Sequence, residues 1–205
     1  SITSITLNSK DLQITGPVTL TSSGEKIISI NCMDVKMIKE KDQLILSGFT
    51  GGQVTHGTWK LNITEFKGIL NDSLCGFYRS KVSDQGKPVA SSTSATTGGQ
   101  GYEFMAVTQF EPADARKAFP CWDEPARKAS FSVTMRVPKS LMALSNMPIK
   151  TNKVLSPVTG AEEEELKEVT FEKSPVMSTY LLAFIVGEFD YVEGRTTKDN
   201  VLVRV

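Results

Sequence analysis

The sequence predicts an all-β protein built from antiparallel sheets in a sandwich-like arrangement, with at most one short helical turn. Two observations support this fold class. Segments rich in β-branched and apolar residues recur throughout the chain, and glycine, asparagine and aspartate separate them. No long segment shows the 3.6-residue apolar spacing of an amphipathic helix. Recurring short strands without helices between them are typical of antiparallel sheets that pack face to face.

The expected strands follow one another along the chain at 4–14, 26–38, 43–49, 57–70, 102–110, 129–138 and 168–175. In the fourth of these, Trp59, Leu61 and Ile63 alternate with polar residues, so we expect them to share one buried face. Phe66 and Ile69 break the alternation, as a bulge or the end of a strand would. Alternation of this kind predicts strands with one face on a core and one face in water.

A nearly continuous apolar run opens the segment 180–194, as expected of a strand that is covered on both faces. The one expected helical turn covers 113–118, directly after Pro112, because proline suits the first turn of a helix. Two segments resemble insertions in hairpin loops. The segment 84–101 is rich in glycine, serine and threonine, and 160–168 carries a run of glutamates that we interpret as a solvated hairpin tip.

Composition limits the classes of function. The chain has 205 residues, 40% of them hydrophobic, which is enough for one large β domain or at most two small ones, and we expect a single β domain over residues 1–205. Lys+Arg and Asp+Glu balance at 23 each, so no excess of positive charge points to nucleic acid or a membrane surface. The apolar run 180–187 is too short to cross a bilayer, which takes about 20 residues. The first residues show no signal peptide and no initiator methionine, so we expect a fragment of a longer protein.

Cysteine and histidine usage argues against several kinds of site. Cys32, Cys75 and Cys121 are odd in number and far apart, which disfavours a disulfide framework and favours a reducing, cytoplasmic location. His56 is the single histidine, so the chain holds no two-histidine zinc site. We expect His56 in an exposed loop or at a strand edge, without a catalytic role.

The segment 108–131 is the most constrained part of the sequence, with three prolines, a tryptophan and several close charges. One interpretation is structural: a stiff prolyl corner between two strands. Arg116, Asp123 and Glu124 would then form local ion pairs and turn hydrogen bonds, while Phe119 and Trp122 would fill the core.

A second interpretation concerns Gln109 and Glu111. These residues are two positions apart at the end of an expected strand, so they share one face, and Phe110 points to the other. Pro112 stiffens the backbone after Glu111. A carboxylate held at a stiff sheet edge beside a carboxamide suits a cationic head group such as a primary ammonium. Polar pairs at strand ends are common, so the residues alone leave both interpretations open.

The stretch "TQFEPADARKAFPCWDEPA" closely resembles the signature of the N-terminal domain of gluzincin zinc aminopeptidases, the family of aminopeptidase N and the puromycin-sensitive aminopeptidase. The stretches "FKGILNDSLCGFYRS", "ALSNMP" and "MSTYLLAFIVGEFDYVEG" resemble the same domain in the same order. The cytosolic puromycin-sensitive-like and fungal branch is the most similar. The resemblance covers essentially the whole chain and implies a saddle-shaped β domain that precedes a catalytic domain.

The resemblance also implies roles for individual residues. Glu111 matches the glutamate that binds the free α-amino group of a peptide substrate, and Gln109 matches a glutamine of the pocket for its first side chain. The zinc of this family is bound by "HExxH" and a distant glutamate, and "GxMEN" supplies a further substrate contact. Neither motif occurs here, so no metal ligand and no catalytic residue is expected in this chain. The expected function is substrate anchoring in a zinc aminopeptidase, with the catalytic domain as partner, and the fragment alone is expected to be inactive.

Two alternatives stay open. The chain could be a stand-alone β-sandwich binding module, because it lacks catalytic histidines. It could also come from a homologue without peptidase activity, or from one resembling leukotriene A-four hydrolase. That last branch typically has glutamine at the position of Glu111, so the glutamate favours a peptidase.

Overall fold

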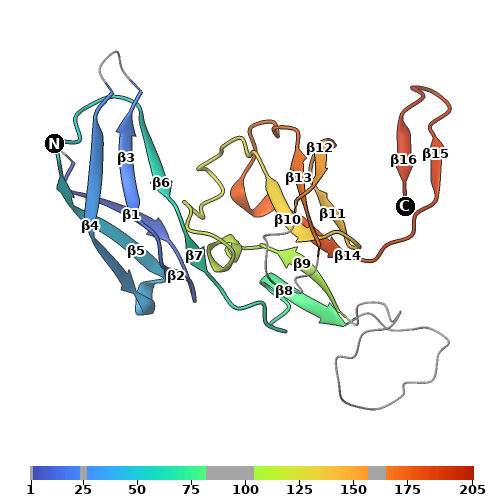
Figure 1. Cartoon of the computed structure of the whole chain (residues 1–205), viewed down its shortest axis with the longest axis horizontal. Helices are drawn as coiled ribbons and strands as arrows, with labels where there is room; N and C mark the ends of the chain where they lie inside the picture. The colour runs from blue at the N-terminus through green and yellow to red at the C-terminus, as the bar shows by residue number, and fades with distance from the viewer. Residues whose placement is uncertain (1, 24–26, 82–103, 157–164) are drawn as a thin grey trace.

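The computed structural model describes residues 2–23, 27–81, 104–156 and 165–205. These residues form antiparallel sheets joined by turns, which confirms the all-β fold class (Figure 1). The expected loop at 84–101 and most of that at 160–168 lie outside the described residues. No helix of the described part is long and apolar enough to cross a membrane.

Five strands between residues 4 and 63 form one sheet with the strand order β1-β5-β4-β3-β6. Its strands are β1 (Ser4–Asn8), β3 (Val18–Ser22), β4 (Ser29–Ile38), β5 (Gln43–Thr50) and β6 (Trp59–Ile63). Along β6, Trp59, Leu61 and Ile63 are partly buried while Lys60 and Asn62 are exposed, as the alternation predicts. The five-stranded sheet therefore follows the apolar pattern of its sequence closely.

Two smaller sheets and two ribbons complete the fold. The four-stranded sheet has the order β11 (Met142–Ser145), β14 (Phe184–Gly187), β9 (Phe104–Gln109) and β8 (Gly76–Lys81). The three-stranded sheet has the order β10 (Thr134–Pro138), β13 (Leu166–Phe171) and β12 (Ile149–Val154). The ribbons pair β2 (Gln13–Ile14) with β7 (Phe66–Lys67), and β15 (Glu193–Arg195) with β16 (Leu202–Arg204).

The segment 4–14 is divided between two sheets rather than forming one strand. β1 ends at Asn8, and Asp11 adopts a left-handed backbone conformation with φ 55° before β2 begins. The left-handed conformation turns the chain between the two strands. Aspartate suits this position, because short polar side chains tolerate the left-handed region better than most residues do.

The expected helical turn is present as the 3-10 turn η2 (Ala115–Lys117), and the described residues contain two others, η1 (Lys39–Lys41) and η3 (Thr179–Leu181). The turn η3 corrects the expectation for 180–194, because its apolar run starts in a 3-10 turn and enters β14 only at Phe184. In a short run in which nearly every residue is apolar, the spacing of apolar residues does not distinguish a buried strand from a buried turn.

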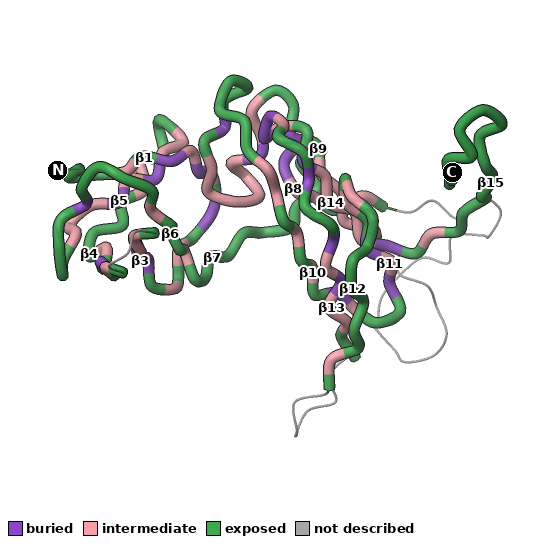
Figure 2. Tube along the Cα trace, turned by 90° about the horizontal axis from the view of Figure 1, so that it is seen from above, coloured by how far each residue is buried: buried purple, intermediate pink, exposed green. Residues whose placement is uncertain are grey.

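Buried residues gather inside and between the sheets, and the C-terminal ribbon is exposed along its whole length (Figure 2). Under the five-stranded sheet the core includes Leu7, Leu44 and Leu46, each at most 4% exposed. A separate core lies where the four-stranded sheet meets the segment 110–133, around Phe110, Ala115 and Leu182. This second core positions the candidate site.

Candidate functional site

The end of β9 presents Gln109 and Glu111 to solvent and buries the residue between them. Phe110 is 2% exposed, whereas both of its neighbours are exposed. Gln109 is the last residue of β9 and pairs with Gly76 of β8. The structure thus places both predicted site residues on the solvent side of the corner.

Phe110 fixes this corner through ring contacts and a backbone turn. Its ring meets those of Phe119 and Phe184 edge-on, with centroids 6.0 Å apart in each case. Its carbonyl accepts a hydrogen bond from the amide of Asp114 at 2.8 Å, which closes the turn that contains Glu111 and the cis Glu111–Pro112 peptide bond. The backbone of Glu111 is therefore held from both sides, because a buried aromatic residue precedes it and a hydrogen-bonded turn follows it.

The side chain of Glu111 is not held by other residues of the described part. Its side chain is exposed, and it makes no hydrogen bond or ion pair with any residue of the described part. A carboxylate with its hydrogen-bonding capacity unused can accept bonds from a ligand without first breaking others. The corner thus combines a fixed backbone with a free negative charge.

The ion pair expected in this segment forms between Arg116 and Asp123. The guanidinium Nε lies 2.9 Å from Asp123 Oδ2, and the same oxygen accepts the Arg116 amide at 3.2 Å. The two side chains are 17% and 2% exposed. Glu124, in contrast, is exposed, and its carbonyl accepts a turn hydrogen bond from the amide of Arg127 at 2.9 Å.

The residues after the corner also connect separate parts of the fold. Cys121 and Asn8 exchange two backbone hydrogen bonds at 2.7 and 3.0 Å, and the Asn8 side chain accepts the amide of Asp123 at 3.0 Å. On the other side, the Ser178 hydroxyl donates to the carbonyl of Pro125 at 2.7 Å. The segment 116–125 thus joins β1 of the five-stranded sheet to the loop before η3. The sequence carried no signal for the role of Asn8, because its partners are more than 110 positions away.

Trp122 corrects one sequence-based expectation. Its side chain does not fill the core but is 52% exposed, while its indole N–H donates to the carbonyl of Thr6 at 3.0 Å. The indole is instead attached to β1 at the surface through this hydrogen bond. Phe119 does pack in the core beside Phe110, as expected.

The cysteines and the histidine occupy distinct surroundings. All three cysteines are free, and each is partly buried. Burial, together with the nearby Asp123 carboxylate, raises the pKa of the Cys121 thiol to about 12. His56 is exposed in a bend between β5 and β6. No group of three or more His, Cys, Asp or Glu side chains within the described ranges could hold a metal ion, so these residues do not fit a zinc site.

Comparison with known proteins identifies relatives of this chain. Residues 1–181 match the Peptidase M1 N-terminal domain. Aminopeptidase M1 of Arabidopsis thaliana is 46% identical over 166 residues, covering 81% of this chain and 16% of that protein. Human aminopeptidase N is 40% identical over 174 residues, covering 84% of this chain and 16% of that protein. The mitochondrial aminopeptidase 2 of Saccharomyces cerevisiae is 40% identical over 204 residues, covering 94% and 19%.

The chain therefore spans less than a fifth of the length of these relatives. Its matched region includes the corner at Gln109 and Glu111 and every strand from β1 to β13, and it ends with η3, before β14 of the four-stranded sheet. Together, the all-β fold and the match over residues 1–181 show that this chain belongs to the Peptidase M1 N-terminal domain family.

Proposed function

We propose that the corner at the end of β9 binds the free amino terminus of a peptide in an aminopeptidase of which this chain is the N-terminal part. Glu111 would pair with the substrate's α-ammonium group, and Gln109 would line the pocket for its first side chain. The single observation that supports this assignment best is the state of Glu111: exposed, without a partner in the described structure, and fixed through the buried ring of Phe110.

The chemistry of the pairing supports a preference for free N-termini. A hydrogen bond between an ammonium and a carboxylate is about twice as strong as one between neutral groups. A peptide with a blocked amino group cannot form it, so it leaves the Glu111 carboxylate without its partner. Binding of the amino terminus by Glu111 therefore fixes how far the cleaved bond lies from the first residue of the peptide. Holding the peptide in this position lowers the activation barrier, because the peptide and the catalytic groups no longer have to meet in the right orientation by diffusion.

Zinc enters this proposal only through the rest of the parent protein. The described residues do not fit a zinc site, and the chain has one histidine. We therefore assign the zinc and all bond-breaking groups to the catalytic domain, and to this chain only the binding of the peptide. The isolated chain is then expected to release no amino acids from peptides.

The C-terminal ribbon is the proposed contact to that catalytic domain. Residues 190–205 are all exposed, and they lie beyond the matched region 1–181. A two-stranded ribbon on its own is marginally stable, so it gains stability when further chain packs on it. We keep residues 1–205 as one β domain and propose a cytoplasmic location, which suits three free cysteines. Cell fractionation of the tagged parent protein would test the location.

Replacement of Glu111 in the full-length parent protein tests the anchor. Glu111→Ala should lower kcat/KM for unblocked peptides by about thirtyfold or more, because losing a charge pair that the catalytic domain and the substrate cover costs at least about 2 kcal/mol. Glu111→Gln keeps the shape of the side chain but loses its charge, so its kcat/KM should lie between those of the unchanged protein and Glu111→Ala. The denaturation midpoint should stay unchanged, since Glu111 has no partner among the described residues.

Glu40 offers a matched control. It is also an exposed glutamate in a short turn, η1, and makes no hydrogen bond or ion pair with the described residues. Glu40→Ala should leave kcat/KM unchanged. If Glu111→Ala and Glu40→Ala gave the same activity, Glu111 would have no part in substrate binding.

A further inference from the structure

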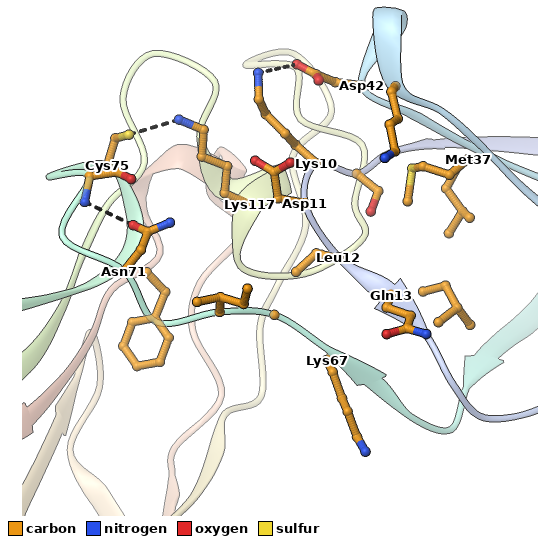
Figure 3. A pocket seen from close by; sticks show the side chains of 18 of the residues that line it. Lys10, Asp11, Leu12, Gln13, Met37, Asp42, Lys67, Asn71, Cys75 and Lys117 are labelled. Atoms are coloured by element: carbon orange, nitrogen blue, oxygen red, sulfur yellow. Dashed lines mark hydrogen bonds and ion pairs between the residues drawn. The ribbon is translucent and has the colours of Figure 1, made fainter.

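A groove of about 1030 Å³ lies between the five-stranded sheet and the start of β8, and neither Gln109 nor Glu111 lines it (Figure 3). Its walls come from β2, β4, β7, the segment 68–75 and η2. Cys75 and Lys117 face each other on this wall, although they are 42 positions apart in the chain. Neither residue belongs to the proposed peptide-binding corner.

The Lys117 ammonium lies between a thiol and a carboxylate. Its Nζ donates to Cys75 Sγ at 2.9 Å and pairs with Asp114 Oδ1 at 2.8 Å. The hydrogen bond to Asp114, followed by that to Cys75, raises the pKa of Lys117, so the amine stays charged at neutral pH. A cation is thereby held against the sulfur.

A close approach of the backbone keeps this pair together. Gly76 follows Cys75 and has φ +73°, and a Cβ added to it would lie 2.7 Å from the Cβ of Lys117. Only glycine accepts both this conformation and this proximity without strain. The start of β8 can therefore pass directly over η2, which brings the thiol to the ammonium.

The other two cysteines serve as an internal comparison, since all three are partly buried. The Cys32 thiol donates to the carbonyls of Ser47 at 3.2 Å and Asp34 at 3.4 Å, and burial raises its pKa. Burial and the Asp123 carboxylate raise that of Cys121 to about 12. Both environments favour the neutral thiol, which is the unreactive form of cysteine.

We propose that Cys75 is a modification site for peroxides, with Lys117 as the positioning residue that activates it. The thiolate sulfur of Cys75 attacks one oxygen of hydrogen peroxide, the O–O bond breaks, and an S–O bond forms. Sulfur is oxidised by two electrons and the peroxide is reduced by two. The departing hydroxide takes a proton from the Lys117 ammonium and leaves as water, which yields cysteine sulfenic acid and a neutral amine that solvent reprotonates.

An independent observation concerns a buried polar group at the wall of the same groove. Ser9 borders it, and its hydroxyl is fully buried without a partner among the described residues. Buried polar groups of folded proteins are usually satisfied, often by a bound water or ligand. A small polar molecule such as peroxide or water is the class of ligand that such a hydroxyl accommodates.

The test uses the full-length protein, brief exposure to hydrogen peroxide, and a 1,3-dione probe that traps sulfenic acid. Labelling is then read for each cysteine peptide by mass spectrometry. Cys75 should carry about tenfold more label than Cys32 or Cys121, because the Lys117 ammonium donates a hydrogen bond to its sulfur, whereas Cys32 donates to two carbonyls and Cys121 is buried beside the Asp123 carboxylate. Equal labelling of the three cysteines would overturn the proposal, and this comparison needs no variant.

Two variants then isolate the part of Lys117. Lys117→Met should reduce labelling of Cys75 to the level of Cys32, and Lys117→Arg should restore most of it because the charge returns. If Lys117 had only a structural role, Cys75 would be labelled to the same extent in Lys117→Met and Lys117→Arg. Unchanged labelling of Cys75 in Lys117→Met would also overturn the proposal.

Discussion

The buried ion pair between Arg116 and Asp123 gives the sharpest prediction about stability. Asp123 is 5% exposed and accepts two hydrogen bonds from Arg116, one from the amide and one from Nε. The change Asp123→Ala removes the oxygen, Oδ2, that accepts both of these bonds. It leaves a guanidinium that is 17% exposed without a counter-charge and an amide without its side-chain acceptor.

The magnitude follows from this burial. Removing one partner of a buried pair costs about 3–5 kcal/mol, because the remaining charge stays desolvated. The chain contains a matched pair for comparison: Arg136 Nε also lies 2.9 Å from a carboxylate oxygen, that of Glu168, but these side chains are 68% and 29% exposed. An exposed pair of this kind contributes about 0.2–1 kcal/mol. Glu168→Ala should therefore cost several-fold less than Asp123→Ala at an identical distance.

Urea denaturation of both variants, with m-values compared, measures the two free energies of unfolding. The double variant with Arg116→Met tests the pairing itself, since it should recover part of the loss when the unpaired cation is removed as well. If Asp123→Ala and Glu168→Ala proved equally costly, burial would not control the strength of these ion pairs, and the corner would not depend on its buried charges.

Two further predictions concern Cys121 and the crossing at Gly76. The folded pKa of about 12 lies above the ordinary value of 9.0, so the unfolded state loses its proton first and stability falls as pH rises from 9 towards 12. Between pH 8 and pH 10 the free energy of unfolding should fall by about 1.4 kcal/mol for this reason. Urea denaturation at each pH measures it, and in Cys121→Ala this contribution should disappear. Gly76→Ala should destabilise by about 1–3 kcal/mol because it forces a side chain into a left-handed conformation with a contact at 2.7 Å. Gly194→Ala, where a Cβ meets nothing within 4 Å, should change the thermal midpoint little, and an equal effect of the two would refute the argument from close approach.

Much of the fold was predictable because local sequence decides which residues face a core. The alternation of Trp59, Leu61 and Ile63 is confirmed by their partial burial, and the burial of Phe110 between exposed neighbours follows from the same period of two. Strand β12 shows where this rule fails. All of its residues are exposed, and it is held by pairing with β13 across a register shift rather than by a buried face.

The candidate site divides in the same way. Pattern and resemblance indicated Gln109 and Glu111. The close charges of the segment predicted local ion pairs among Arg116, Asp123 and Glu124, and the structure shows that Arg116 pairs with Asp123. The exposure of Trp122 was not predictable, since an aromatic residue in a proline-rich segment is buried or exposed according to what packs on it. Its hydrogen-bond partner, Thr6, is 116 positions away.

The sequence by itself determined the all-β class, the family, and the two residues proposed to hold a peptide, because each depends on neighbours within a few positions. The tertiary structure alone decided that 116–125 joins two sheets through Asn8, that Glu111 is left without a partner in the described region, and that Cys75 meets Lys117. The physical reason is that contacts between distant segments depend on how whole sheets pack. A local pattern reports which side of a strand is apolar, but not which segment covers it.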